Sequence, residues 1–269
     1  MIPQDYHMHT EYSPDSKTPM ELMCLSAIEK GIPEIGFTEH YDLHPEEWPR
    51  DWFKPRPWFN ELRRCRELFH GRLIIRAGVE LGEPHLYAEE VRALTAGQPF
   101  DYLLGSLHWV GRRNIFDRAY FERSATEAYG EFFLELEEMT RAGGFDILSH
   151  FDVPTRLGAV VYGGYDPRPY EGLIRPVLRN CIQRGIALDV NTSAMRGRAK
   201  VLNPGLEILR WYVELGGRRV TLGSDAHHPD QVGSHLDEAL AAIRAAGLTH
   251  LTFFENRQAR LVPLPAQAL

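Results

Sequence analysis

The stretch DYHMHT, residues 5–10, places two histidines two positions apart near the start of the chain. In a β-strand alternate side chains point to the same face, so His7 and His9 would leave one face of a strand together. Two imidazoles arranged in this way can bind one metal ion. A lone His-x-His pair is more often an ordinary core or surface feature, so this stretch predicts a metal site only if other parts of the chain supply further ligands.

The rest of the chain repeats one pattern, a short apolar strand followed by a helix. Strands are expected at 1–10, 32–38, 73–81, 102–107, 145–149, 186–190 and 220–223, and helices at 18–30, 59–70, 86–96, 126–142, 170–184, 204–215 and 235–246. Alternating β and α elements with apolar strands indicate a parallel sheet covered by helices. Seven such units suit either a barrel or an open doubly wound sheet, and no break in composition marks a second domain.

Two stretches carry local signals of their own. The helix expected at 18–30 has Thr18 as its predicted N-cap, Pro19 as its first residue and Glu21 as its capping-box partner. The segment 41–58 is rich in proline and tryptophan and is too long for a plain connection. Long loops in compact domains are often lids or binding loops, so we expect this one to have such a role.

Metal-capable residues follow nearly every expected strand. They are His7 and His9, His40, Glu80, His108, His150, Asp225 and His227. In a parallel barrel the loops after the strands converge around one mouth. In an open sheet the outer strands would end too far apart to share a site. The positions of these residues therefore favour a closed barrel with a metal site at the carboxyl ends of its strands.

Any one of the histidines, taken alone, would more often be a hydrogen-bonded core residue than a ligand. Glu80 is different, because it lies in the apolar run AGVEL at 77–81 and carboxylates are rarely buried unless they are paired or bind metal. Asp225 and His227 repeat the two-residue spacing at the end of the last barrel strand, which would pair with the first. The set as a whole therefore predicts a metal site.

The types of ligand indicate which ions would bind. Imidazole and carboxylate without thiolate suit zinc, iron or manganese, and argue against copper(I) or an iron–sulfur cluster. One zinc ion needs about four ligands. The six histidines and three acidic residues, Asp15, Glu80 and Asp225, would suffice for two or three divalent ions if one carboxylate bridges.

Overall composition restricts the class of protein. The chain has 269 residues, 43% hydrophobic and 25% charged, which is enough for one large core, and we expect a single domain over residues 1–269. A net charge of −7 disfavours a nucleic-acid partner but allows a small phosphorylated substrate held by a few cations. Three scattered cysteines, no secretory signal and no long apolar segment predict a cytoplasmic protein with no membrane partner.

Six motifs along the chain together resemble those of the polymerase and histidinol phosphatase (PHP) family. They are the His-x-His of the first strand, GFTEH at 36–40, GVE at 78–80, GSLHW at 105–109, SHFD at 149–152 and GSDAH at 223–227. The resemblance extends over the whole chain. Within the family, the length and the segment DYLLGSLHW at 101–109 are most similar to monofunctional histidinol-phosphate phosphatases of histidine biosynthesis.

This resemblance implies a distorted seven-stranded (β/α) barrel, similar to a TIM barrel, with a trinuclear metal site. The implied ligand sets are His7, His9, Glu80 and Asp225 for the first ion, Glu80, His108 and His150 for the second, and Asp15, His40 and His227 for the third. The implied reaction is hydrolysis of L-histidinol phosphate to L-histidinol and inorganic phosphate.

The expected mechanism needs no protein nucleophile. Two ions that share Glu80 would lower the pKa of a water between them, so that it can attack phosphorus. Arg156, six residues after His150, and Arg196 or Arg198 are predicted to offset the charge of the phosphate, since the planar guanidinium matches phosphate geometry. The alternative for each arginine is a solvated surface position.

The segment 41–58 is predicted to cover the leaving group, with Asp42 or Glu83 meeting the substrate ammonium; the alternative is a subunit contact in a homo-oligomer. Other activities stay open. They are a PHP-family phosphoesterase acting on nucleotides or nucleic-acid ends, a metal-dependent amidohydrolase, and a non-catalytic metal-binding barrel. The negative net charge weighs against an exonuclease.

Overall fold

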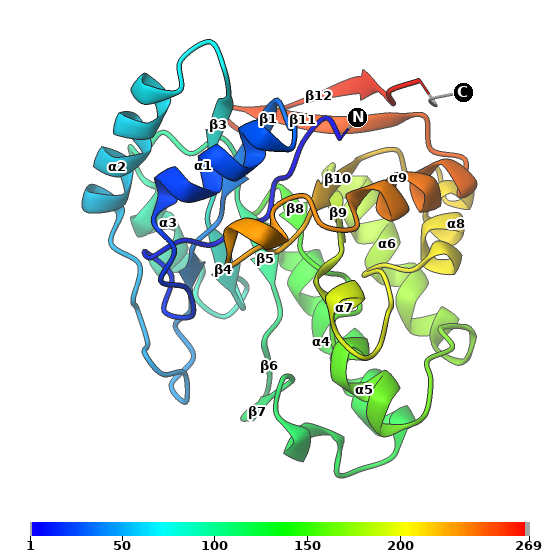
Figure 1. The fold of residues 1–269 in the computed structure, drawn as a ribbon. Coiled ribbons are helices and arrows are strands. Elements are labelled where there is room, and N and C mark those ends of the chain that lie inside the picture. The colour runs from blue at the N-terminus through cyan, green and yellow to red at the C-terminus, as the bar shows by residue number, and fades with distance from the viewer. Residues whose placement is uncertain (1, 267–269) are drawn as a thin grey trace.

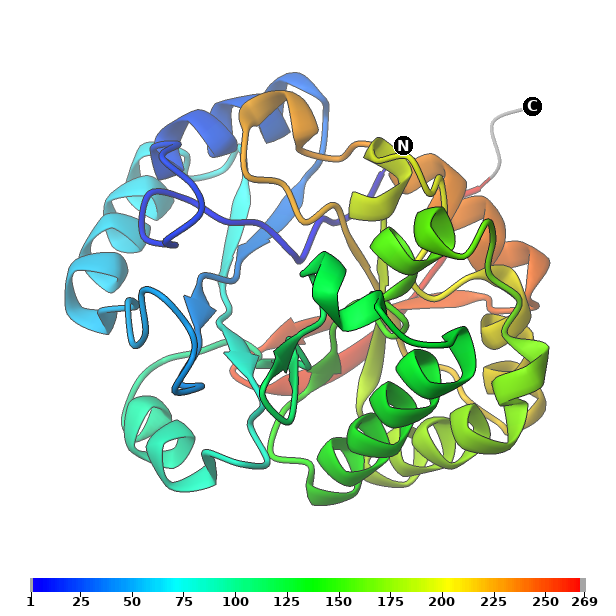
Figure 2. The same ribbon diagram turned by 90° about the horizontal axis from the view of Figure 1, so that it is seen from below.

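Parallel strands form the centre of the molecule, and helices surround them (Figures 1 and 2). The computed structural model describes residues 2–266. Its largest sheet has the order β10-β9-β8-β5-β4-β2, with parallel neighbours throughout. The strands are β2 (His40–Tyr41), β4 (Glu80–Gly82), β5 (Leu104–Ser106), β8 (Ile147–Leu148), β9 (Ala187–Asn191) and β10 (Val220–Gly223), while β1 (Glu34–Phe37) and β3 (Ile74–Ala77) pair with each other just before β2 and β4 in the chain.

The amino-terminal segment closes this sheet into a barrel. Residues 5–9 lie between β1 and β10. On one side the Asp5 amide donates to the Glu34 carbonyl at 3.0 Å, and on the other the Tyr6 amide donates to the Leu222 carbonyl at 2.8 Å. The strand expected at the start of the chain is therefore present as the seam of the barrel, and the prediction of a distorted seven-stranded (β/α) barrel is confirmed.

The helices begin and end close to their predicted positions. They are α1 (Met20–Glu29), α2 (Pro55–Leu68), α3 (Ala88–Thr95), α4 (Ala125–Ala142), α6 (Glu171–Arg184), α8 (Leu206–Glu214) and α9 (Leu236–Ala245). Two short helices that we did not expect, α5 (Thr155–Val161) and α7 (Ser193–Arg196), follow β8 and β9. Among the described residues, no helix has both the length and the apolar character needed to cross a membrane.

The predicted capping box of α1 does not form. The helix begins at Met20 after Pro19, and no side chain caps it. The Thr18 hydroxyl instead donates to the carbonyl of His227 at 2.8 Å. The local pattern was therefore overridden by a tertiary partner, and Thr18 connects the loop before α1 to the loop after β10.

The amino-terminal end of the barrel is covered by an antiparallel hairpin of β11 (His250–Glu255) and β12 (Gln258–Pro263). From the sequence alone, residues 251–254 are expected to form a short strand followed by a proline-containing tail, so β11 is confirmed and β12 was missed. Beneath the hairpin the rings of Tyr6 and Tyr102 stack with centroids 5.0 Å apart. This end is packed, and the barrel is open at the opposite end, where Figure 1 shows β6 (Trp109–Val110), β7 (Arg113–Asn114), α5 and α7.

Candidate metal centre

The structure brings all nine predicted ligands together at the carboxyl ends of the strands. Their nitrogen and oxygen atoms form four overlapping groups, within each of which the atoms lie no more than 4.8 Å from one another. The groups are His7, His9 and Asp225; His7, Glu80 and His150; His40, Glu80 and His108; and His9, Asp15, His40 and His227. His40 thus lies beside the residues expected for two different ions, a sharing that the implied ligand sets did not include.

Glu80 lies at the centre of these groups and is fully buried at the start of β4. Five imidazole nitrogens lie within 3.4 Å of its two oxygens. They belong to His7 (3.2 Å), His9 (3.4 Å) and His40 (3.3 Å) on Oε2, and to His150 (3.0 Å) and His108 (3.4 Å) on Oε1. The Ser106 hydroxyl also donates to Oε1 at 2.6 Å. Both carboxylate oxygens are therefore in position to be shared between neighbouring ions.

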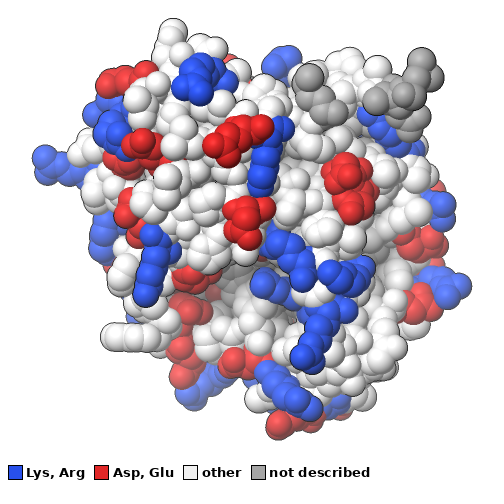
Figure 3. Space-filling view, in the orientation of Figure 1, with Lys and Arg blue, Asp and Glu red and all other residues white. Residues whose placement is uncertain are grey.

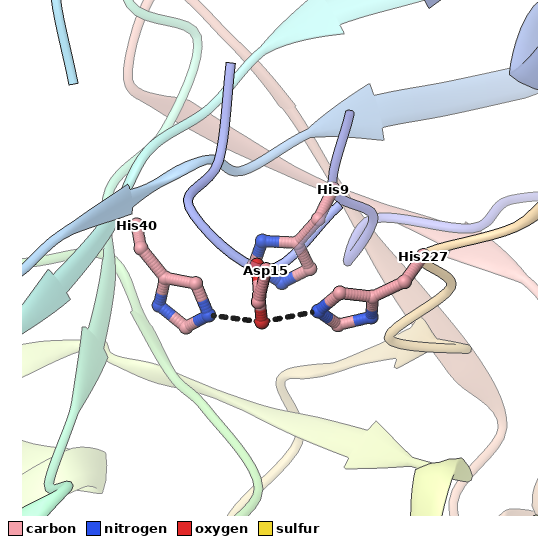
Figure 4. A group of neighbouring side chains, drawn as sticks. All are labelled: His9, Asp15, His40 and His227. Carbon is pink, nitrogen blue, oxygen red and sulfur yellow. Dashed lines mark hydrogen bonds and ion pairs between the residues drawn. The ribbon is translucent and has the colours of Figure 1, made fainter. Parts of the chain in front are cut away.

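Asp15 forms the more open side of the centre. Figure 4 shows its carboxylate between two histidine rings, with Oδ2 at 2.7 Å from His227 Nε2 and 3.4 Å from His40 Nε2. The His9 ring stacks between the same two rings, at 4.4 Å from each centroid. The Asp15 side chain is 46% exposed, whereas Glu80 is buried, so solvent and substrate approach the centre from the Asp15 side.

The donor atoms fit divalent cations. Two buried ring nitrogens, His9 Nε2 and His40 Nδ1, have no hydrogen-bond partner among the described residues, although each lies within 3.4 Å of Glu80 Oε2. Buried polar atoms are normally satisfied, so such orphans need an explanation. Nitrogen and carboxylate oxygen atoms that converge without bonding to one another are arranged as a cation would require. Zinc, iron and manganese all accept this mixed set.

The electrostatics of the centre agree with this fit. Burial alone would raise the pKa of the Glu80 carboxyl, but the facing imidazoles of His7 and His40 hold that pKa well below its usual range. Burial lowers the pKa of His9 to about 4, and repulsion from His227 and His40 acts in the same direction. The carboxylate is therefore ionised and the His9 ring neutral at pH 7, which are the forms that bind metal. Burial alone would lower the pKa of His7, His40 and His108, but the facing carboxylates hold it well above its usual range, so these three rings must release a proton when a cation binds.

Three side chains that the sequence did not predict as partners of the candidate ligands contact their rings from behind. Asp189 Oδ2 lies 3.0 Å from His7 Nδ1, and Ser13 Oγ lies 3.0 Å from His9 Nδ1. Asp42 Oδ1 lies 3.1 Å from His108 Nδ1. Asp189 had a detectable signal, a carboxylate within an apolar strand, which is the feature that identified Glu80. The pairing of each residue with its ring depends on tertiary structure and had no such signal.

The structure does not support the predicted contacts to a substrate ammonium. The Asp42 carboxylate contacts the His108 ring. Glu83 Oε1 accepts hydrogen bonds from the backbone amides of His108 and Trp109 at 2.6 and 3.0 Å. Burial raises the pKa of Glu83 to about 7. Both carboxylates are buried, and neither belongs to the described lining of the pocket, although Glu83 Oε2 has no hydrogen-bond partner among the described residues.

The segment 41–58 also lies elsewhere than expected. It contributes no residue to the lining of the pocket described below, as far as the described part of the chain shows. Trp58 belongs to α2, is fully buried and donates to Glu39 at 3.2 Å, while the His44 ring stacks on Trp109 at 4.2 Å. The loop is held against β6 by such contacts, so it does not cover the centre as the sequence suggested.

A pocket of about 1050 Å³ opens over the metal ligands. Its other wall is formed by α5, α7 and the loop after β7, and Figure 3 shows Lys and Arg side chains gathered along one side of a hollow in this face. The basic and apolar residues of this wall are Phe116, Arg118, Arg156, Leu157, Val160, Val161, Arg196 and Arg198. Cations and apolar surface thus face the histidine and carboxylate ligands across the pocket.

The two predicted arginines both line the pocket but have different surroundings. Arg156 makes no side-chain hydrogen bond or ion pair with any described residue, and its guanidinium lies 6.0 Å from the centre of the Phe116 ring. Arg196 donates to the backbone carbonyls of Ser224 and Asp225, at 2.5 and 2.8 Å. Arg156 is therefore available to an anion, whereas Arg196 also stabilises the turn that carries Asp225.

Residues 5–193 match the PHP domain family. A probable histidinol-phosphatase of Clostridium acetobutylicum is 30% identical over 255 residues, which cover 94% of this chain and 97% of that protein. A protein of the same description from Deinococcus radiodurans is 30% identical over 258 residues, covering 93% and 95%.

Structural similarity extends over the same length. A crystal structure of histidinol phosphate phosphatase from Lactococcus lactis, complexed with zinc, L-histidinol and phosphate, matches with a TM-score of 0.87 and covers 96% of this chain and 98% of that one. At 24% identity this similarity establishes the fold.

Proposed function

The chain belongs to the PHP domain family, and we propose that it is a metal-dependent phosphomonoesterase that hydrolyses L-histidinol phosphate to L-histidinol and phosphate in histidine biosynthesis. The observation that carries the reaction class is the convergence of six histidines and three carboxylates at the floor of a pocket whose opposite wall holds arginines. The substrate follows from the two relatives that are 30% identical over almost the whole chain and are described as probable histidinol-phosphatases.

We assign the nine converging residues to a trinuclear site of zinc, iron or manganese. His7, His9 and Asp225 would hold one ion, and Glu80 would join it to a second ion that His108 and His150 complete. A third group, on the open side, consists of Asp15, His40 and His227. Bound at these positions, the ions supply electrophilic catalysis and lower the pKa of water for attack on a phosphate ester.

The pocket walls would bind the rest of the substrate. Arg156, with no partner among the described residues, would donate to the non-bridging oxygens of the phosphate, because a guanidinium can donate two parallel hydrogen bonds to such an anion. Phe116, Val160 and Val161 are the apolar part of the same pocket and would contact the leaving group. Catalysis would then depend on arginine charge at one end of the substrate and on apolar contact at the other.

The remaining parts of the proposal concern the chain as a whole. We treat residues 1–269 as one PHP-type domain, which the barrel and its continuous core of buried residues support. All three cysteines are free and buried, which agrees with a reducing compartment and a cytoplasmic location.

The test is phosphate release by protein loaded separately with zinc, iron or manganese, with and without a chelator. Histidinol phosphate should exceed a panel of nucleotides in kcat/KM by on the order of 10²-fold, the scale on which one pocket separates leaving groups. Faster hydrolysis of a nucleotide would replace the substrate assignment. If the protein binds metal but releases phosphate from none of the esters, the non-catalytic metal-binding barrel would be the correct alternative.

A further inference from the structure

Two buried aspartates stand behind the candidate ligands. Asp189, within β9, faces His7, and its Oδ2 lies 3.0 Å from His7 Nδ1. Asp42, directly after β2, faces His108, and its Oδ1 lies 3.1 Å from His108 Nδ1. The other nitrogen of each ring, Nε2, faces Glu80, at 3.2 Å for His7 and 3.4 Å for His108. Each aspartate therefore contacts the far nitrogen of a ring whose near nitrogen points into the metal centre.

A glycine on a neighbouring strand makes room for each aspartate. A Cβ atom at Gly223, in β10, would lie 2.4 Å from Asp189 Oδ1. A Cβ atom at Gly82, in β4, would lie 2.1 Å from Asp42 Oδ1. Both separations are far below van der Waals contact, so any larger residue would displace the carboxylate from its histidine. The same device thus occurs twice, on two pairs of adjacent strands.

Packing alone does not account for these carboxylates. Burying an ionised carboxylate is costly unless it is paired, and an apolar side chain of similar volume would fill either position without that cost. Asp189 Oδ1 has no hydrogen-bond partner among the described residues, so its position is costly even with His7 as neighbour. The feature that the two positions share is contact with a ligand ring.

We propose that these two aspartates are positioning residues: each keeps the proton of its histidine on Nδ1, so that Nε2 is free to bind an ion. The proposal rests on the metal-binding part of the proposed function. A carboxylate only accepts hydrogen bonds, so the facing ring nitrogen must be the donor. A neutral imidazole has one proton, and fixing it on one nitrogen leaves the lone pair of the other for the metal.

The two aspartates act on opposite sides of the centre. His7 faces Oε2 of Glu80 and His108 faces Oε1. Fixing the orientation of both rings therefore fixes where a ring nitrogen lies relative to each oxygen of the Glu80 carboxylate. Loss of either aspartate should weaken metal binding on one side of the centre, and loss of both should weaken metal binding on both sides.

The first experiment measures zinc binding by equilibrium dialysis for Asp189→Asn, Asp42→Asn, the double variant and the wild type. Each single change should lower zinc affinity by about 10- to 100-fold, the usual cost of losing a carboxylate partner of a ligating histidine. Asp166→Asn is the matched control, because Asp166 is exposed and, within residues 2–266, its side chain pairs only with Arg168. Gly82→Ala should reproduce the Asp42→Asn effect although Asp42 itself is retained.

The second experiment reads the ring protons directly, by ¹⁵N NMR of histidines in the zinc-loaded protein. The wild type should show His7 and His108 with the proton on Nδ1, and each asparagine variant should lose that signal for its own ring. A merely structural role would not move these signals. A wild type with the proton on Nε2 of either ring, or asparagine variants that bind zinc as tightly as the wild type, would overturn the proposal.

The outcomes separate this proposal from the function on which it rests. Zinc binding that weakens in the asparagine variants supports the proposal even if histidinol phosphate is not hydrolysed. Hydrolysis with unchanged zinc affinity in the variants refutes it while the function stands. A wild type that binds no zinc, iron or manganese would refute both.

Discussion

The two ends of the barrel use the same strands but differ in the kind of polar atom that they leave unpaired. At the end covered by the hairpin, Tyr102 donates to the Tyr6 carbonyl at 2.7 Å and Arg76 donates to Glu34 at 2.7 Å, while the buried Thr252 hydroxyl of β11 has no partner among the described residues. At the open end, the described atoms without a hydrogen-bond partner include two ring nitrogens, His9 Nε2 and His40 Nδ1. Both ends therefore contain unpaired polar atoms, but those at the open end include imidazole nitrogens, which can bind a metal ion.

Left-handed backbone at residues other than glycine occurs at both ends, at Asn256 and Arg257 in the turn between β11 and β12 and at Asp225 in the open end. Asp225, just beyond β10, has a φ of 54°, a left-handed conformation that few residues other than glycine adopt readily. Its conformation is supported by Arg196, which donates to its carbonyl, and by the His7 carbonyl, which accepts from its amide. Strain of this kind collects where function requires a side chain to be aimed. The comparison therefore teaches that the left-handed residues of the closed end turn a hairpin, whereas Asp225, at the open end, is itself a candidate metal ligand.

Removing the metal should have the largest effect. Dialysis against a chelator should abolish phosphate release, and zinc, iron or manganese should restore it, because the ligand atoms have no other function at the open end. Thermal unfolding measured with and without metal should show that the ion also stabilises the fold, by about 2.7 kcal/mol when the free ion is at 100 times its Kd. Full activity after exhaustive chelation would show that the open end does not differ from the closed end by binding a catalytic metal.

Glu80→Gln should come next. The amide keeps the shape of the side chain but removes the charge that faces five imidazoles, so kcat should fall by on the order of 10³-fold or more. The measurement is kcat together with the metal content of the purified variant, with circular dichroism as the control for folding. A variant with nearly normal kcat would show that Glu80 is only a buried core residue.

Arg156→Ala should have a smaller effect, confined to substrate. We expect kcat/KM to fall by on the order of 10²-fold, as is usual when one donor to a developing charge is removed, with metal content retained. The kcat/KM and metal content of Arg156→Ala are compared with those of Arg118→Ala, since Arg118 lines the same pocket. Unchanged kinetics for Arg156→Ala would remove this arginine from the phosphate site.

Arg196→Ala should differ from Arg156→Ala in one measurable respect. Because Arg196 stabilises the turn that carries Asp225, its removal should lower metal content as well as activity. Metal analysis of the two variants side by side separates an arginine that binds only substrate from one that also supports a ligand.

A change at the closed end should have the smallest effect on activity. Tyr102→Phe leaves the Tyr6 carbonyl without its donor, which should cost about 1–3 kcal/mol of unfolding free energy. The kcat for phosphate release should stay within about twofold, since the change lies at the far end of the strands. A large loss of activity with normal stability would mean that the two ends are not separable.

The sequence predicted which residues converge at the open end because two regularities combine. Apolar runs identify the strands, and residues at the carboxyl ends of parallel strands meet at one mouth whatever the loops do. His7 and Asp225 could be expected near each other without knowledge of any side-chain conformation, and the structure places them in one group.

What the sequence did not predict depends on contacts between distant elements. The pairing of Asp189 with His7 depends on the relative register of strands that are not neighbours, and no local pattern encodes it. The strand β12 is mostly exposed, so it lacks the apolar alternation that marks a strand and is recognisable only by its partner. Thr18 had an ideal local role as a helix cap but a stronger tertiary partner in His227.

The seam of the barrel also governs when the metal centre can exist. Ser224 donates to Asp5 across 219 positions of sequence, and ligands from both edges of that seam belong to one group. A nascent chain still attached to the ribosome lacks one edge until most of it has been made. Metal loading must therefore follow synthesis of nearly the entire polypeptide, and a prematurely terminated chain would offer only an incomplete cage that cannot compete for ions with the finished protein.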